Sequence, residues 1–210
     1  MTSKSLFLGV AALCTLPAAG LAQTTATLIS ENFDELTPAN GVTGPVGVFS
    51  SLAPGTVNIL GPMSGLCFAL ASGNCVELGR ANPNGGVLES NPLLLQPGDS
   101  YSLSFDLIGN RSAGGSTNLT VSLGSFSTTF NPSPSSSQLV TQPITVAAAT
   151  STRLTFTGTS GNAGSVLDNI LLTCSGPTCS PVANVPEPAT LGLMVLGLLG
   201  AGLSGRKRRH

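Results

Sequence analysis

The sequence predicts an all-β fold, a β-sandwich of the jelly-roll type, for the central part of the chain. The first observation is that short runs alternate apolar and polar residues and are separated by Gly, Pro, Asn and Asp, which is the pattern of half-buried strands joined by turns. The second is that no segment between the two ends has helical periodicity. The third is that 41% of the residues are hydrophobic and only 8% are charged, so the central part has enough apolar surface to fold.

The strands can be located in order along the chain. Tyr101–Leu107 alternates most clearly and follows the turn formed by residues 96–99. Leu119–Leu123 and Phe126–Phe130 flank Gly124 and Ser125, which predicts a hairpin. In the Gly- and Pro-rich stretch 38–66, a single strand is predicted. The remaining predicted strands are residues 27–33, 56–60, 75–78, 139–146, 153–157 and 167–173. They bring the total to about nine, the number typical of a sandwich.

The N-terminus has the features of a signal peptide. Lys4 precedes the apolar stretch Leu6–Leu16, and small residues follow up to Ala22. We expect cleavage after Ala22, which makes residues 1–22 the signal peptide and residues 23–184 an exported ectodomain of one domain. Cys14 lies inside the apolar stretch and does not indicate a lipoprotein.

The C-terminus, residues 185–210, has three parts in a fixed order. A motif of Val185, Pro186, Glu187 and Pro188 comes first, and its prolines keep the glutamate in an extended peptide. The uncharged run 189–205 follows and predicts a transmembrane helix of about 25 Å, slightly shorter than a bilayer core. The chain then ends in a basic cluster that would remain in the cytoplasm, formed by Arg206, Lys207, Arg208 and Arg209.

These three parts together resemble the PEP-CTERM sorting tail of exopolysaccharide-producing Gram-negative bacteria. The resemblance implies that an exosortase-type membrane protease cleaves near the motif. It also implies an inner-membrane intermediate that is passed on to the cell surface or extracellular matrix. The alternative is an ordinary C-terminal membrane anchor preceded by a proline-containing linker.

The charge of the ectodomain excludes some partners. Eight acids stand against three bases, Arg80, Arg111 and Arg153, which gives a net charge of −5. Because phosphate binding needs clustered Lys or Arg, we expect no nucleic-acid binding.

The residues available for catalysis are also few. His210 is the only histidine and the ectodomain has no lysine, which removes Ser-His-Asp, Cys-His and His-ligated zinc sites. A glycosidase with two carboxylates is the enzyme class left open, but nothing pairs the acids in the sequence. We therefore expect solvated surface acids and no enzymatic activity.

A second resemblance, to galactose-binding-like and carbohydrate-binding-like jelly rolls, covers most of residues 30–173. It rests on residues 75–79, 85–90, 97–106, 153–156 and 167–170. The resemblance implies a structural calcium site made by Asp34, or Glu31, together with Asp168. Two carboxylates are an incomplete calcium shell, so backbone carbonyls would have to add ligands. The alternative is that Asp168 ties down a bend at the entry to a strand.

Four cysteines remain after removal of the signal peptide, and they predict disulfides in an oxidising compartment. Three pairings are open, and the local one joins neighbours along the chain. The four residues are Cys67, Cys75, Cys174 and Cys179.

The function expected is a non-enzymatic protein of the cell surface or matrix, associated with exopolysaccharide. The alternative is a carbohydrate-binding module with a defined glycan, and a hydrolase is the third class. The chain has no Trp, and Tyr101 alternates with apolar neighbours, which predicts a core position. A polar loop with Arg80, Asn82 and Asn84 is open as a recognition surface.

Overall fold

The computed structural model describes residues 24–67, 73–79, 85–111, 117–158 and 164–179. Within these residues the protein is almost entirely β-structure, and the single helical segment is the 3₁₀ turn Pro62–Ser64. No helix in this part of the chain is long and apolar enough to cross a membrane. The predicted signal peptide and the whole C-terminal tail lie outside the described residues, so both stay predictions.

The strands of the first half are β1 (Thr24–Glu31), β2 (Ala39–Val42), β3 (Gly44–Val46), β4 (Phe49–Ser51), β5 (Val57–Leu60), β6 (Cys75–Leu78), β7 (Val87–Ser90) and β8 (Leu93–Leu95). Those of the second half are β9 (Ser100–Ile108), β10 (Leu119–Leu123), β11 (Phe126–Phe130), β12 (Ser137–Thr145), β13 (Thr150–Thr152), β14 (Thr155–Gly158) and β15 (Val166–Gly176).

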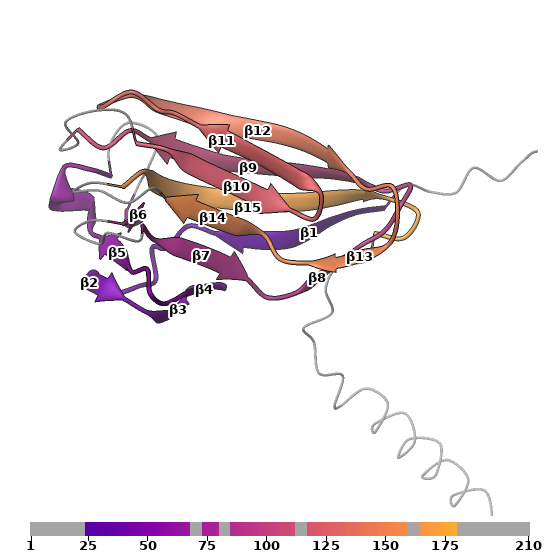
Figure 1. Cartoon of the computed structure of the whole chain (residues 1–210), viewed down its shortest axis with the longest axis horizontal. Helices are drawn as coiled ribbons and strands as arrows, with labels where there is room; N and C mark the ends of the chain where they lie inside the picture. The colour runs from indigo at the N-terminus through magenta and orange to yellow at the C-terminus, as the bar shows by residue number, and fades with distance from the viewer. Residues whose placement is uncertain (1–23, 68–72, 80–84, 112–116, 159–163, 180–210) are drawn as a thin grey trace, which may run out of the picture.

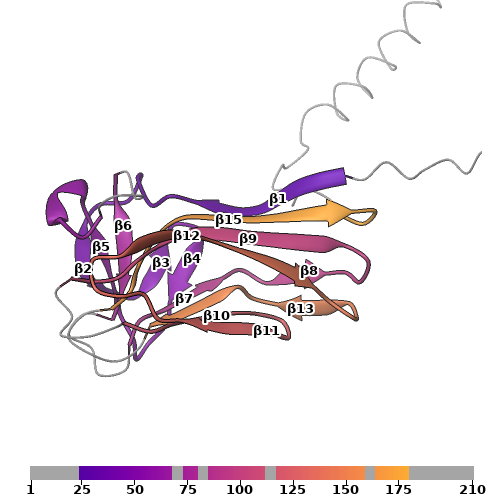
Figure 2. The same cartoon turned by 90° about the horizontal axis from the view of Figure 1, so that it is seen from above.

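The strands form two antiparallel sheets packed face to face, as Figures 1 and 2 show. The seven-stranded sheet has the order β12-β9-β15-β6-β5-β2, and β1 pairs with β15 beside this path. The six-stranded sheet has the order β11-β10-β14-β7-β4-β3. The short pair β13-β8 extends the sandwich at one end. The fold is thus a jelly-roll-like β-sandwich, as the alternation predicts.

Aromatic side chains join the two sheets. Phe105 of the seven-stranded sheet packs edge-to-face on Phe156 of the six-stranded sheet, with ring centroids 5.3 Å apart. Phe49 and Phe130 extend this cluster along the inner face. Tyr101 is buried with them, as predicted. The inner face of each strand therefore carries the residues that the period-2 pattern assigns to the core.

A second, smaller core lies on the other side of the seven-stranded sheet. The loop after β5 folds over this face, and its apolar residues pack on Ile108 and Val166. The disulfide Cys67–Cys75 closes this loop, and Cys174–Cys179 closes the turn after β15. The prediction of disulfides is confirmed, and the pairing is the local one.

Several strands differ from the prediction. Within residues 38–66 the chain forms β2, β3 and β4 as well as β5, because runs of three or four residues are too short to show alternation. β1 ends at Glu31, since the Glu31 carboxylate accepts the Phe33 amide and the backbone turns there. The predicted strand 153–157 begins only at Thr155, as β14, and Arg153 and Leu154 lie in the break between β13 and β14, which pair with different neighbours.

Candidate functional site

The outer face of the six-stranded sheet carries a row of polar side chains in cross-strand register. Ser122 lies opposite Ser127 on one side and Thr155 on the other. Thr155 is in turn opposite Glu89, and Glu89 is opposite Ser50. Strands lie about 4.8 Å apart, so these five positions extend over about 19 Å. We call this set, Ser127, Ser122, Thr155, Glu89 and Ser50, the polar row.

A parallel line of threonines lies two residues along each strand, about 7 Å from the polar row. It is formed by Thr129, Thr120 and Thr157, and the hydroxyl oxygens of Thr120 and Thr129 are 2.9 Å apart. Residues between the two lines, such as Phe156, point into the core. The sheet thus presents a surface of hydroxyl groups on an apolar support.

A shallow hollow of about 350 Å³ lies beside the middle of the polar row, at Ser122 and Thr155. Its lining includes Ser122, Ser151, Thr155 and Arg153, together with Pro92. The hydroxyls of Ser122, Ser151 and Thr155 form no hydrogen bond with another described residue. They are therefore available to a ligand that both donates and accepts hydrogen bonds.

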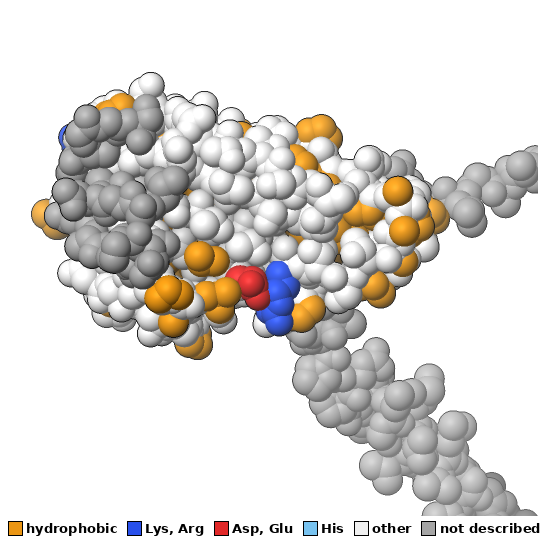
Figure 3. All heavy atoms as spheres, viewed as in Figure 1, with side chains coloured by type: hydrophobic (Ala, Val, Ile, Leu, Met, Phe, Trp, Pro, Cys, Tyr) orange, Lys and Arg blue, Asp and Glu red, His pale blue; other side chains and the backbone are white. Residues whose placement is uncertain are grey.

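Arg153 and Glu89 form the charged centre of this surface. Arg153 Nε lies 3.0 Å from Glu89 Oε1, and Arg153 Nη1 donates to the Ser90 carbonyl at 2.8 Å. Figure 3 shows an acidic and a basic side chain lying side by side on a face that is otherwise mostly uncharged. A guanidinium has five N–H donors, so after these two contacts Arg153 keeps donors for a ligand. The pair has no net charge.

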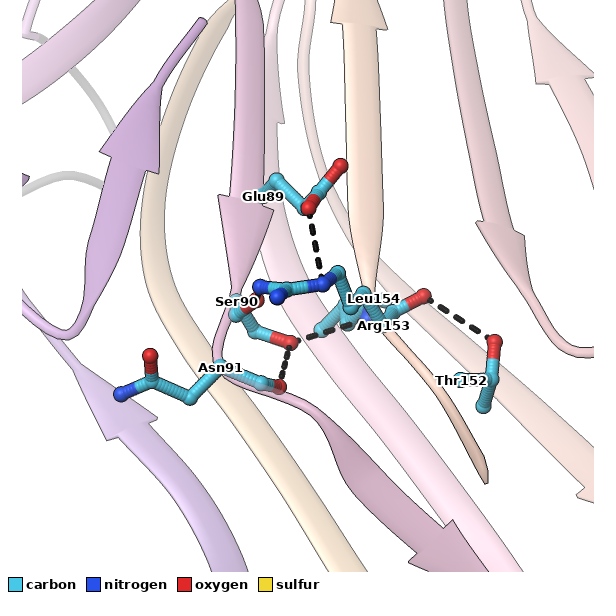
Figure 4. Close-up of polar contacts among 6 residues, drawn as sticks. All are labelled: Glu89, Ser90, Asn91, Thr152, Arg153 and Leu154. Atoms are coloured by element: carbon cyan, nitrogen blue, oxygen red, sulfur yellow. Dashed lines mark hydrogen bonds and ion pairs between the residues drawn. The ribbon is translucent and has the colours of Figure 1, made fainter. Parts of the chain in front are cut away.

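Ser90 fixes the chain segment that carries Arg153. The Ser90 hydroxyl accepts the Leu154 amide at 3.0 Å and donates to the Asn91 carbonyl at 2.8 Å, as Figure 4 shows. The Ser90 amide donates to the Leu154 carbonyl at 2.9 Å. This bridging holds the chain where it passes from β13 to β14. The guanidinium position thus depends on a buried hydroxyl of a different strand.

Four of the eight acids predicted to be solvated surface groups, Glu77, Asp99, Asp106 and Asp168, are buried, and for these the expectation was wrong. Glu77 is fully buried, and its carboxylate accepts the amides of Asn58 at 2.9 Å and Asn110 at 2.5 Å. Asp99 is also buried and accepts the backbone amide of Thr178 at 3.2 Å and its hydroxyl at 2.5 Å. In a domain without lysine, amide and hydroxyl donors take the place of cations around these carboxylates.

The two residues of the predicted calcium site have separate surroundings. Asp34 accepts the Asn74 amide at 2.9 Å and thereby holds the loop before β6. Asp168 is fully buried, lies opposite Asp106 in the β15-β9 ladder, and accepts the Asn169 amide at 2.8 Å. Asn169 also donates to Asp106 at 2.8 Å and has a positive φ of 50°. The chain bends at this point, and the calcium assignment stays a prediction.

Glu31, the other acid considered for calcium, accepts the amides of Phe33 at 2.8 Å and Val48 at 2.7 Å. Within the described ranges, a single group of three possible metal-ligating side chains lies close together, Asp99 with Cys174 and Cys179. Both of these sulfurs are in a disulfide, so they offer no thiolate to a metal.

The remaining predicted site residues lie outside the described residues. These are the loop with Arg80, Asn82 and Asn84, the motif Val185–Pro188 and the basic cluster 206–209. The polar row was missed by sequence reasoning, although the alternation that defines its strands already places Ser122 and Thr155 on the outer face.

Comparison with known proteins identifies the C-terminal motif. Residues 184–209 match the family model of the PEP-CTERM protein-sorting motif, which indicates export and sorting to the cell surface. No curated protein sequence matches the chain.

Solved structures share the fold at low sequence identity. An arabinose-bound MgGH51 α-L-arabinofuranosidase is 11% identical with a TM-score of 0.51, and the match covers 71% of this chain and 26% of that one. The CBM22-1 xylan-binding domain of Paenibacillus barcinonensis Xyn10C is 12% identical with a TM-score of 0.46, covering 72% of this chain and 96% of that one. The match to the arabinofuranosidase supports the β-sandwich fold. This chain spans only about a quarter of that enzyme's length.

Proposed function

We propose that this is an exported, non-enzymatic protein of the cell surface or extracellular matrix, whose ectodomain binds a neutral stretch of exopolysaccharide along the polar row. In this proposal an exosortase-type protease processes the chain at Val185–Pro188. The observation that carries the binding role is the polar row with its Arg153–Glu89 pair.

The chemistry of the row suits a neutral glycan. Sugar hydroxyls donate and accept hydrogen bonds, and neighbouring hydroxyls on one ring can meet the Glu89 carboxylate and the Arg153 guanidinium together. The uncharged hydroxyls of Ser122 and Thr155 continue these contacts along the sheet. An acidic polymer would meet the negative charge of Glu89 and the net negative charge of the ectodomain.

Binding is favoured over hydrolysis by the arrangement of the acids. A glycosidase needs two carboxyl groups about 5 to 9.5 Å apart on either side of the scissile bond. The polar row, as defined among the described residues, has one carboxylate, that of Glu89. This carboxylate forms an ion pair with Arg153. Asp106 and Asp168, which lie opposite each other on the seven-stranded sheet, are buried and both accept the side-chain amide of Asn169, which suits a structural role.

Affinity electrophoresis of the exported protein in gels containing exopolysaccharide from a producing strain tests the proposal. Arg153→Gln should weaken binding at least about tenfold, since charged hydrogen bonds contribute about 1.5–3 kcal/mol. Arg111→Gln removes the same charge from a residue outside the polar row and should bind as wild type does. Equal mobility shifts of wild type and Arg153→Gln would contradict the proposed site.

The salt dependence of retardation provides an independent measurement. A neutral glycan held by an ion pair of zero net charge should bind almost equally at about 0.05 and 0.5 M NaCl, whereas an anionic polymer is screened at the higher salt. A steep fall in retardation with salt would exclude a neutral ligand.

A further inference from the structure

A cavity of about 540 Å³ lies beside the disulfide Cys174–Cys179, and one of its lining residues, Pro92, also lines the hollow beside the polar row. Its buried lining includes Ile29, Leu93 and Tyr101. Two of its lining residues are large apolar side chains that remain exposed, Val48 at 45% and Leu94 at 65%. Covering these side chains would remove apolar surface from water, so the cavity favours an apolar occupant.

The deeper polar groups of this cavity already have partners within the fold. The Tyr101 hydroxyl accepts the Gln96 amide at 2.6 Å. Asp99 holds the amide and hydroxyl of Thr178. These groups therefore have fewer hydrogen-bonding positions left for a sugar than the hydroxyls of Ser122 and Thr155 in the polar row. The cavity and the polar row therefore suit different ligands.

The strand β1 borders the cavity with a free edge. β1 pairs with β15, and within the described residues no strand pairs with its other edge. A register shift between Thr27 and Ile29 marks a bulge, and both Leu28 and Ile29 line the cavity because of it. An extended peptide could add to this edge through main-chain hydrogen bonds and insert apolar side chains into the cavity.

We infer that the occupant is the segment Ser180–Asn184 of the same chain. Cys179 lines the cavity, so this segment begins at the cavity wall. The segment has the sequence Ser-Pro-Val-Ala-Asn, carries no charge, and reaches about 17 Å when extended. Covalent attachment gives it a high effective concentration that a separate peptide lacks.

Docking of this segment brings the sorting motif, which starts at Val185, close to the folded domain. The segment lies before the motif and is present with or without processing. The inference is therefore independent of glycan binding and of cleavage by an exosortase.

Elastase digestion of the full-length exported protein, followed by intact-mass analysis, tests the inference, because elastase cuts after small apolar residues such as Val182 and Ala183. In wild type these bonds should be protected. Leu94→Asp should speed their cleavage at least tenfold, since it places a charge in the lining of the cavity. Leu139→Asp is the matched control, because Leu139 is 64% exposed and lies on β12, outside the cavity. It should be cut as slowly as wild type.

A photo-crosslinker placed at position 182 gives the second measurement. Crosslinks to residues 28–30 or 93–94 within one molecule are expected. Wild-type cleavage as fast as that of Leu94→Asp would overturn the inference. Crosslinks between two molecules, or protection that rises with protein concentration, would also overturn it by identifying a second copy as the occupant.

Discussion

The substitution Ser90→Ala tests whether the position of the Arg153 segment depends on one buried hydroxyl. Ser90 is 2% exposed, and its hydroxyl is the acceptor for the Leu154 amide and a donor to the Asn91 carbonyl. Alanine leaves the buried Leu154 amide without this acceptor and removes little volume. Loss of a buried hydrogen-bond partner costs about 1–3 kcal/mol of unfolding free energy. With a urea m-value of about 2 kcal/mol/M, the midpoint should fall by about 0.5–1.5 M.

Urea denaturation followed by circular dichroism measures this change in the exported protein. Ser102→Ala is the control, because Ser102 is exposed on β9 and its hydroxyl has no hydrogen bond to a described residue. Its unfolding free energy should change by less than about 0.5 kcal/mol. Ser90→Ala also links stability to binding, since it should weaken glycan retardation by loosening the position of Arg153. Equal midpoints for Ser90→Ala and Ser102→Ala would refute the reasoning.

Three further predictions concern a buried acid, the calcium assignment and the tail. Glu77→Leu should lower the unfolding free energy by about 2–4 kcal/mol in urea denaturation, because two buried amides, those of Asn58 and Asn110, lose their acceptor; a wild-type midpoint would contradict this. Calcium should raise the melting temperature of wild type relative to a chelator but leave that of Asp168→Ala unchanged, as calorimetry would show. A wild-type protein that melts identically in both conditions has no such site. Glu187→Ala should leave the unprocessed chain in the inner membrane, which intact-mass analysis of surface and membrane fractions detects; the full tail in both wild type and variant would leave the plain-anchor alternative.

The comparison between sequence and structure is clearest at particular strands. Residues 119–123 and 126–130 form the predicted hairpin with the predicted bounds, because a two-residue turn and strict alternation are local properties. Residues 153–157 do not form one strand. The chain changes its pairing partner there from β8 to β7. The Leu154 amide donates instead to the hydroxyl of Ser90, 64 residues away in sequence.

The burial of the acids is likewise not predictable from the local sequence. Alternation in 75–78 places Glu77 on the side of the sheet away from the main core, and the sequence gives no sign that this side is covered. In the structure the loop after β5 covers it, closed by Cys67–Cys75, and Glu77 is enclosed with Asn58 and Asn110. Burial of this carboxylate therefore depends on a loop whose path is a tertiary property.

The sequence by itself determined the features carried by contiguous residues: the sorting motif at 184–209, the low charge of the ectodomain and the alternation of its longer strands. Only the tertiary structure decided that Ser122, Thr155 and Glu89 form one row, and that the cavity opens where the chain leaves β15. The physical reason is that side-chain alternation is fixed by the geometry of a single strand. Which strands become neighbours, and in which register, is fixed by the packing of the whole sandwich.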